Sequence, residues 1–95
     1  MAAFTIMRSR VESFDDFIKT FAEGEETRRA AGMRATVVAR DAQDPSVVVV
    51  QSRWDDVATA KRFLTSDRMR ESMKKAGVQA PELHFVEIAH EATYA

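Results

Sequence analysis

The sequence predicts one α+β domain over residues 1–95, built around a four-stranded antiparallel sheet. Four segments are rich in β-branched and aromatic residues, and two segments carry apolar residues at helical spacing. They follow one another in the order βαββαβ, which is the split βαβ unit of ferredoxin-like folds. Right-handed crossovers in this topology place both helices on the same face of the sheet.

The first strand and the first helix are predicted from the N-terminal quarter of the chain. Residues 4–11, FTIMRSRV, alternate roughly between apolar and polar side chains, as a strand does. Ser13 can then cap a helix, because its side-chain oxygen can accept from backbone N–H groups of the first turn. The apolar residues at helical spacing form one stripe, whose phenylalanines we expect to be core: Phe14, Phe17, Ile18 and Phe21.

Two further strands are predicted after this helix. The helical pattern weakens at Gly24, resumes through residue 31, and ends at Gly32, where a left-handed terminating residue is expected. Residues 33–40 and 47–54 are the two strands. The segment between them, DAQDPS, predicts a turn because Pro45 cannot donate a ladder hydrogen bond.

The second helix is predicted to break and restart. Asp55 is expected to cap it, and Ser66 in the sequence TSD can end the first piece and cap the next. Gly77 is expected to end the second piece, in which Met69 and Met73 lie on one face as core residues. The first piece has an apolar inner face formed by Val57, Ala60, Phe63 and Leu64.

The last strand is expected over residues 82–95, ELHFVEIAHEATYA. Regular alternation would place His84, His90 and Tyr94 on one side of it, with His90 and Tyr94 in a tail packed on a partner chain. The two histidines would be about 20 Å apart and could not bind one metal within a chain. With no cysteine in the chain, we predict neither a disulfide nor a metal site.

An apolar sheet face without helices predicts a partner. Four consecutive valines, residues 47–50, direct apolar side chains to both faces of their strand. The helices cover only one face, and an uncovered apolar face is a contact or pocket surface. A second copy of the chain is the simplest cover, so we predict a homodimer whose two sheets face each other.

Four polar residues on the predicted strands are the candidate site. Arg8 lies in a central strand and must be paired or face a wet cavity, because an isolated buried charge is very costly. Gln51 and Arg53 lie on the side opposite Trp54, which we expect to be a core anchor, and could line the same cavity. We interpret Arg8, Gln51 and Arg53 as substrate-binding candidates and His84 as the catalytic candidate. The alternative is that all four are satisfied by local pairing.

Composition narrows the classes of partner. The net charge is −1, from 14 basic and 15 acidic residues, so no bulk field favours nucleic acid. No apolar run has the length of a signal peptide or a membrane span. We therefore expect a soluble, cytoplasmic protein that binds neither nucleic acid nor membrane.

Several stretches also carry a family resemblance: RVESFDDFIKTF, AAGM, RDAQDPSVVVV and AKRFLTSDRMRESMKKAGVQAPELHFVE. They resemble the dimeric α/β-barrel superfamily that includes antibiotic-biosynthesis monooxygenase-like proteins, and most of all a group of small cyclase-like proteins. Ser9 stands where that group often has a histidine. The positions typical of the group are held by Phe63, Ser66, Met69, Met73, Gly77, Val78 and Pro81.

The resemblance implies a dimeric barrel but leaves two functions open. The first is a small-molecule pocket, in a cofactor-independent monooxygenase-like or cyclase/isomerase-like enzyme in which His84 could serve as a general base. The second is a non-catalytic dimeric binding or structural module with a packed barrel. Polar residues that converge on a cavity would favour the first function, and polar residues that pair with one another would favour the second.

Overall fold

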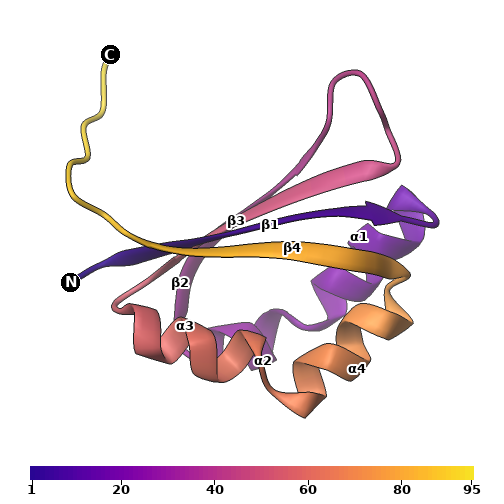
Figure 1. Cartoon of the computed structure of the whole chain (residues 1–95), viewed down its shortest axis with the longest axis horizontal. Helices are drawn as coiled ribbons and strands as arrows, with labels where there is room; N and C mark the ends of the chain where they lie inside the picture. The colour runs from indigo at the N-terminus through magenta and orange to yellow at the C-terminus, as the bar shows by residue number, and fades with distance from the viewer.

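The computed structural model describes residues 1–95 as four strands and four helices (Figure 1). The strands are β1 (Ala3–Val11), β2 (Met33–Arg40), β3 (Val47–Trp54) and β4 (Val78–Glu87). The helices are α1 (Phe14–Glu23), α2 (Glu25–Ala30), α3 (Val57–Leu64) and α4 (Asp67–Lys75). This order confirms the predicted βαββαβ class, with each predicted helix divided into two pieces.

The sheet has the order β2-β3-β1-β4, and every neighbouring pair of strands is antiparallel. All four helices lie on one face of it, and the opposite face carries no helix (Figure 1). This is the ferredoxin-like arrangement, in which the two crossovers have the same hand. None of the helices combines the length and the hydropathy needed to cross a membrane.

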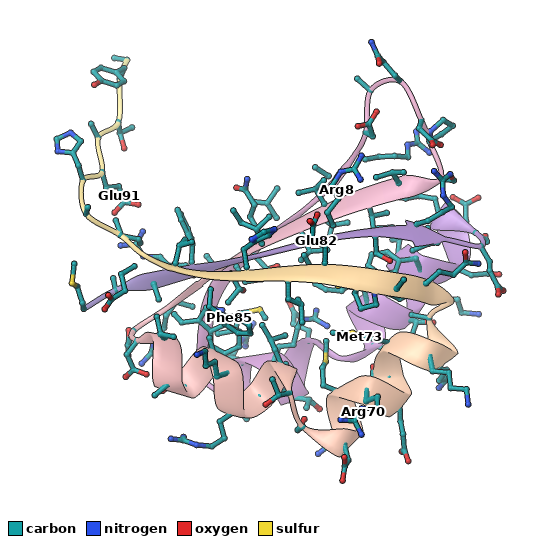
Figure 2. The ribbon with its side chains drawn as sticks, in the orientation of Figure 1. Arg8, Arg70, Met73, Glu82, Phe85 and Glu91 are labelled. Atoms are coloured by element: carbon teal, nitrogen blue, oxygen red, sulfur yellow. The ribbon has the colours of Figure 1, made fainter.

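Strand alternation divides the side chains between the two faces. Figure 2 shows Arg8 and Glu82 on the side without helices, and Phe85 and Met73 on the helical side. On β1, every second residue from Ala3 to Val11 is buried beneath the helices. We call the other side the open face, and the registers assign to it Phe4, Ile6, Arg8, Val37, Val49, Gln51, Arg53, Glu82, His84 and Val86.

Trp54 anchors one of the two buried clusters, as predicted. It is 0% exposed, together with Ala3 and Ala60. Its Nε1 donates to the Thr5 Oγ1 at 3.0 Å, and its ring packs against Phe63 with centroids 5.9 Å apart. A buried indole N–H needs such a partner.

The break between α3 and α4 confirms the predicted role of Ser66. Its Oγ accepts from the Met69 backbone N–H at 3.2 Å and donates to the Phe63 carbonyl at 2.7 Å. The predicted cap of α3 was wrong by one residue. Asp56, with extended backbone, accepts from the Thr59 N–H at 2.7 Å, whereas Asp55 pairs with Arg34.

The prediction for the last strand was wrong at both ends, because β4 begins four residues earlier and ends at Glu87. Between Gln79 and Glu82, β4 has two residues where β1 has only Ser9, so the ladder contains a bulge. Ala80 has a φ of +46° there, and the Ser9 Oγ donates to the Gln79 carbonyl at 2.7 Å. This bulge accommodates Pro81 at an edge strand.

The C-terminal residues beyond β4 do not continue the sheet. Residues 88–95 have no regular secondary structure. His90 and Tyr94 therefore do not share a strand face with His84, and Tyr94 is 88% exposed. The sequence could not show where β4 ends, because the alternation of apolar and polar residues continues past the last residue that pairs with β1.

Candidate functional site

The four predicted site residues all lie on the open face. Ile6 of β1 faces Gln51 on one neighbouring strand and His84 on the other. Arg8 lies two residues further along β1, and Arg53 two residues beyond Gln51 on β3. The structure thus places the four predicted site residues on one surface, as the alternation of side chains along the strands predicted.

Three of these four residues have acidic neighbours. Arg8 lies 4.0 Å from Asp41, the His84 Nε2 lies 3.8 Å from a carboxylate oxygen of Glu82, and Arg53 donates to Glu91 in the C-terminal tail. The hydrogen bond and charge of Arg53 lower the pKa of Glu91. The side chains of Arg8 and His84 are more than half exposed. Catalysis by His84 and substrate binding by the other three stay predictions.

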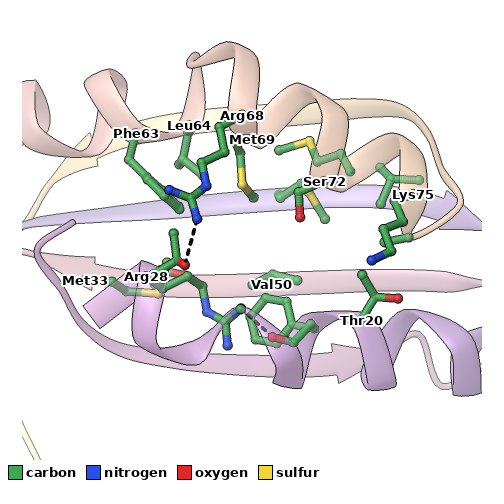
Figure 3. Close-up of a pocket in the computed structure, with 18 of the residues that line it drawn as sticks. Thr20, Arg28, Met33, Val50, Phe63, Leu64, Arg68, Met69, Ser72 and Lys75 are labelled. Carbon is green, nitrogen blue, oxygen red and sulfur yellow. Dashed lines mark hydrogen bonds between the residues drawn. The ribbon is translucent and has the colours of Figure 1, made fainter. Parts of the chain in front are cut away.

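A cavity of about 270 Å³ lies on the opposite side, between the sheet and the helices (Figure 3). Helix-facing side chains of the sheet form its floor, and side chains of all four helices form its walls and mouth. None of the four predicted site residues lines it. Its apolar lining consists of Met7, Phe17, Phe21, Met33, Val50, Phe63, Leu64, Met69, Met73, Ala76, Val78 and Leu83.

The lining is soft as well as apolar. Four of the five methionines of the chain contribute to it, and the unbranched thioether adapts its shape to what it contacts. Phe17 and Phe21 stack with ring centroids 5.8 Å apart. Sequence spacing predicted Phe17, Phe21, Met69 and Met73 as core, and they do face the interior. Spacing could not show that the helices leave a gap there.

Two buried hydroxyls add polarity to the floor. Thr5 and Ser52 are each 3% exposed. The Ser52 Oγ is hydrogen-bonded to Thr36 Oγ1 at 3.0 Å. Thr5 Oγ1 accepts from Trp54 at 3.0 Å and donates to no protein atom, so its O–H can donate to a bound molecule.

The mouth of the cavity lies between α4 on one side and α1 and α2 on the other (Figure 3). Arg68 reaches across it from α4, with its Nη2 3.4 Å from the Thr27 Oγ1. On the opposite wall, the Arg28 guanidinium donates to the Phe21 carbonyl and stacks 3.7 Å above the centroid of the Phe21 ring. Burial lowers the pKa of Arg28. Neither arginine was among the candidate site residues predicted from the sequence.

Comparison with known proteins gives a family and a fold. The sequence model of the family described as antibiotic biosynthesis monooxygenase matches residues 3–75. Among curated protein sequences, none shows significant similarity to this chain.

Solved structures from several organisms share the fold. SnoaB, a cofactor-independent oxygenase from Streptomyces nogalater, superposes with a TM-score of 0.78 at 14% identity, over 95% of each chain. A proposed antibiotic biosynthesis monooxygenase from Bordetella bronchiseptica gives 0.79 at 18% identity, over 94% of this chain and 98% of its own. A conserved protein from Methanosarcina mazei gives 0.72 at 18% identity, over 90% of each chain.

Proposed function

Because the chain belongs to the antibiotic biosynthesis monooxygenase family, we propose that it is a cofactor-independent, monooxygenase-like enzyme that acts on a small organic molecule. The observation that carries the proposal is the apolar cavity of about 270 Å³, with a buried hydroxyl on its floor. Cavities of this kind, with few polar groups in an apolar lining, are the usual binding sites of small molecules.

The chemistry requires an activated substrate. A methylene group beside a carbonyl or an aromatic ring loses a proton to water, and the resulting carbanion transfers electrons to O₂. One oxygen atom becomes the new carbonyl oxygen, and the other leaves as water with the two methylene hydrogens. The substrate supplies all the electrons, so the balance needs no further reductant.

The cavity residues have defined roles in this proposal. The apolar walls exclude water, which strengthens every polar interaction inside. The Thr5 O–H, fixed by the Trp54 N–H, donates to the substrate carbonyl where negative charge develops after proton removal. A cyclase- or isomerase-like reaction would begin with the same proton removal but would consume no O₂.

The proposal also includes a homodimer. The open face exposes apolar side chains, with Val37 59% and Val86 41% exposed. Packing this face against its equivalent in a second copy would remove that surface from water.

Oxygen uptake with anthrone tests the proposed activity. Anthrone has a flat apolar body and a methylene between two aromatic rings, and its product would be anthraquinone. We expect uptake above the rate without protein, and at least a tenfold loss in Met69→Trp, because the larger side chain fills the cavity. Circular dichroism would verify that the variant is folded.

The variant His84→Gln distinguishes the cavity from the open face. Retained uptake in His84→Gln, with loss in Met69→Trp, supports the cavity. The reverse pattern would move the site to the open face, where the sequence predicted it. Uptake no faster than in buffer would contradict oxygenation of this class of substrate.

The second candidate is the non-catalytic dimeric module. The acidic neighbours of Arg8, Arg53 and His84 favour it, since they offer these polar groups partners on the open face without a ligand. A module of this kind would bind a cavity ligand without converting it, or bind none.

A further inference from the structure

The charges around the cavity are unlike those of the whole chain. The chain has a net charge of −1. The lining of the cavity, however, includes three cationic side chains, Arg28, Arg68 and Lys75, and a single carboxylate, Glu23. Positive charge is therefore concentrated at the mouth of an otherwise apolar cavity.

The spacing on α4 explains how two of these cations reach the mouth. Arg68, Ser72 and Lys75 are four and three residues apart, so they lie on one face of the helix. Arg70 and Lys74 belong to the same helix but do not line the cavity, and Arg70 is paired with Asp67 at 3.1 Å. The helix thus carries cations that face the cavity and cations that do not, and replacing the second kind is a control for replacing the first.

The cations at the mouth form no close ion pairs, although the charge of Glu25 acts on Arg28. No carboxylate oxygen lies within 4.0 Å of Arg28, Arg68 or Lys75. The only hydrogen bond from the Arg68 side chain is the long contact with Thr27. Arg28, held by the Phe21 carbonyl, adds a fixed positive charge on the wall beside Thr27. The Arg68 guanidinium is free to bind a group that enters between these two walls.

We propose that the cavity selects a carboxylic acid, with its apolar body among the methionine and phenylalanine side chains and its carboxylate at the mouth, bound by Arg68. This proposal rests on the proposed function, because it places the ligand in the same cavity. Arg68 is exposed at the mouth, and its guanidinium can form charge-assisted hydrogen bonds with a carboxylate there. Arg28 and Lys75 strengthen the field, and Glu23 opposes it. The cavity is slightly smaller than the usual range for ligand pockets, which favours an acid of one to three rings.

Calorimetric titration with 2-naphthoate and 2-naphthamide near neutral pH tests this selection. The two probes have nearly the same shape, and only the first is charged. We expect the acid to bind about tenfold more tightly than the amide, as one charge-assisted contact predicts. Raised salt should reduce this preference.

Matched variants assign the preference to Arg68. Arg68→Gln should abolish most of the preference for the acid over the amide, and Lys75→Gln should weaken this preference less. Arg70→Gln removes the same charge from α4 away from the cavity and should leave the preference for the acid unchanged. Glu23→Gln should increase the preference for the acid.

Two outcomes would overturn the proposal: acid and amide binding equally, including no binding of either, or a preference that survives in Arg68→Gln. The oxygenase proposal fails separately. Selective binding of the acid, without O₂ uptake in the anthrone assay, would refute oxygenation of that substrate class and leave the selection of acids intact.

Discussion

Thr5 links the packing of the core to the floor of the cavity. Its Oγ1 accepts the buried Trp54 N–H at 3.0 Å, and its own hydrogen remains available. A threonine in the middle of a strand is unremarkable as sequence, because β-branched residues favour strands. Its importance comes from Trp54, which is 49 residues away in the chain.

Replacing Thr5 separates these two roles. Thr5→Val keeps the shape but leaves the indole N–H unpaired, which should destabilise the fold by about 1–3 kcal/mol. It should also reduce oxygen uptake if the Thr5 hydroxyl is the proposed donor to the substrate. Chemical denaturation followed by Trp54 fluorescence measures the first effect.

Thr5→Ser is the matched control for that experiment. It keeps the hydroxyl and should retain most of the activity, at a smaller loss of stability from the missing methyl group. Equal stabilities of wild type and Thr5→Val would contradict the proposed role of the hydrogen bond.

At the scale of elements, the turn between β2 and β3 is held by two aspartates. Asp41 accepts from the backbone N–H groups of Gln43 and Asp44. Asp44 accepts from the hydroxyl and the N–H of Ser46, and from Arg10. These hydrogen bonds hold the pKa values of both carboxyl groups below their usual range, chiefly through the backbone donors for Asp41 and the Ser46 hydroxyl for Asp44.

The lowered pKa of Asp44 predicts a pH dependence. A carboxyl group with a lower pKa in the folded state stabilises the fold above its unfolded pKa of about 4 and loses that contribution as pH falls through the folded pKa. Asp44→Asn should therefore have a lower Tm than wild type at neutral pH, and the difference should shrink below about pH 4. Thermal unfolding at several pH values measures this. A difference that stays constant from neutral to acidic pH would contradict the prediction.

At the scale of the whole molecule, the two faces of the sheet have different roles. The helical face encloses the cavity, and the open face carries exposed apolar residues beside paired charges. If the open face is a dimer interface, the four residues predicted from the sequence belong to an interface, and the cavity of each subunit opens away from it.

A charge on the open face should separate the subunits. We expect wild type to be a dimer by light scattering, and Val37→Glu to be a monomer at the same concentration, because an unpaired carboxylate would be buried at the interface. Ile18→Glu is the matched control, since Ile18 is an exposed apolar residue on α1 and should leave the dimer intact. A monomeric wild type would contradict the facing-sheet dimer.

The sequence by itself determined the order of the elements and the sheet face of the side chains on β1 and β3. The bounds of β2 and β3, the cap at Ser66 and the burial of Trp54 follow from local periodicity, turn residues and capping, which act over a few neighbours. The open-face position of Arg8 and His84 follows in the same way from strand alternation.

Only the tertiary structure decided where the cavity lies and which residues surround it. Periodicity gives the direction of a side chain from its own element, but not the distance between that element and the next. The distance between α4 and the α1–α2 pair is an example, because it leaves the cavity open and still allows Arg68 to reach Thr27. The end of β4 was undetermined for a related reason, because a strand ends where its partner stops pairing with it.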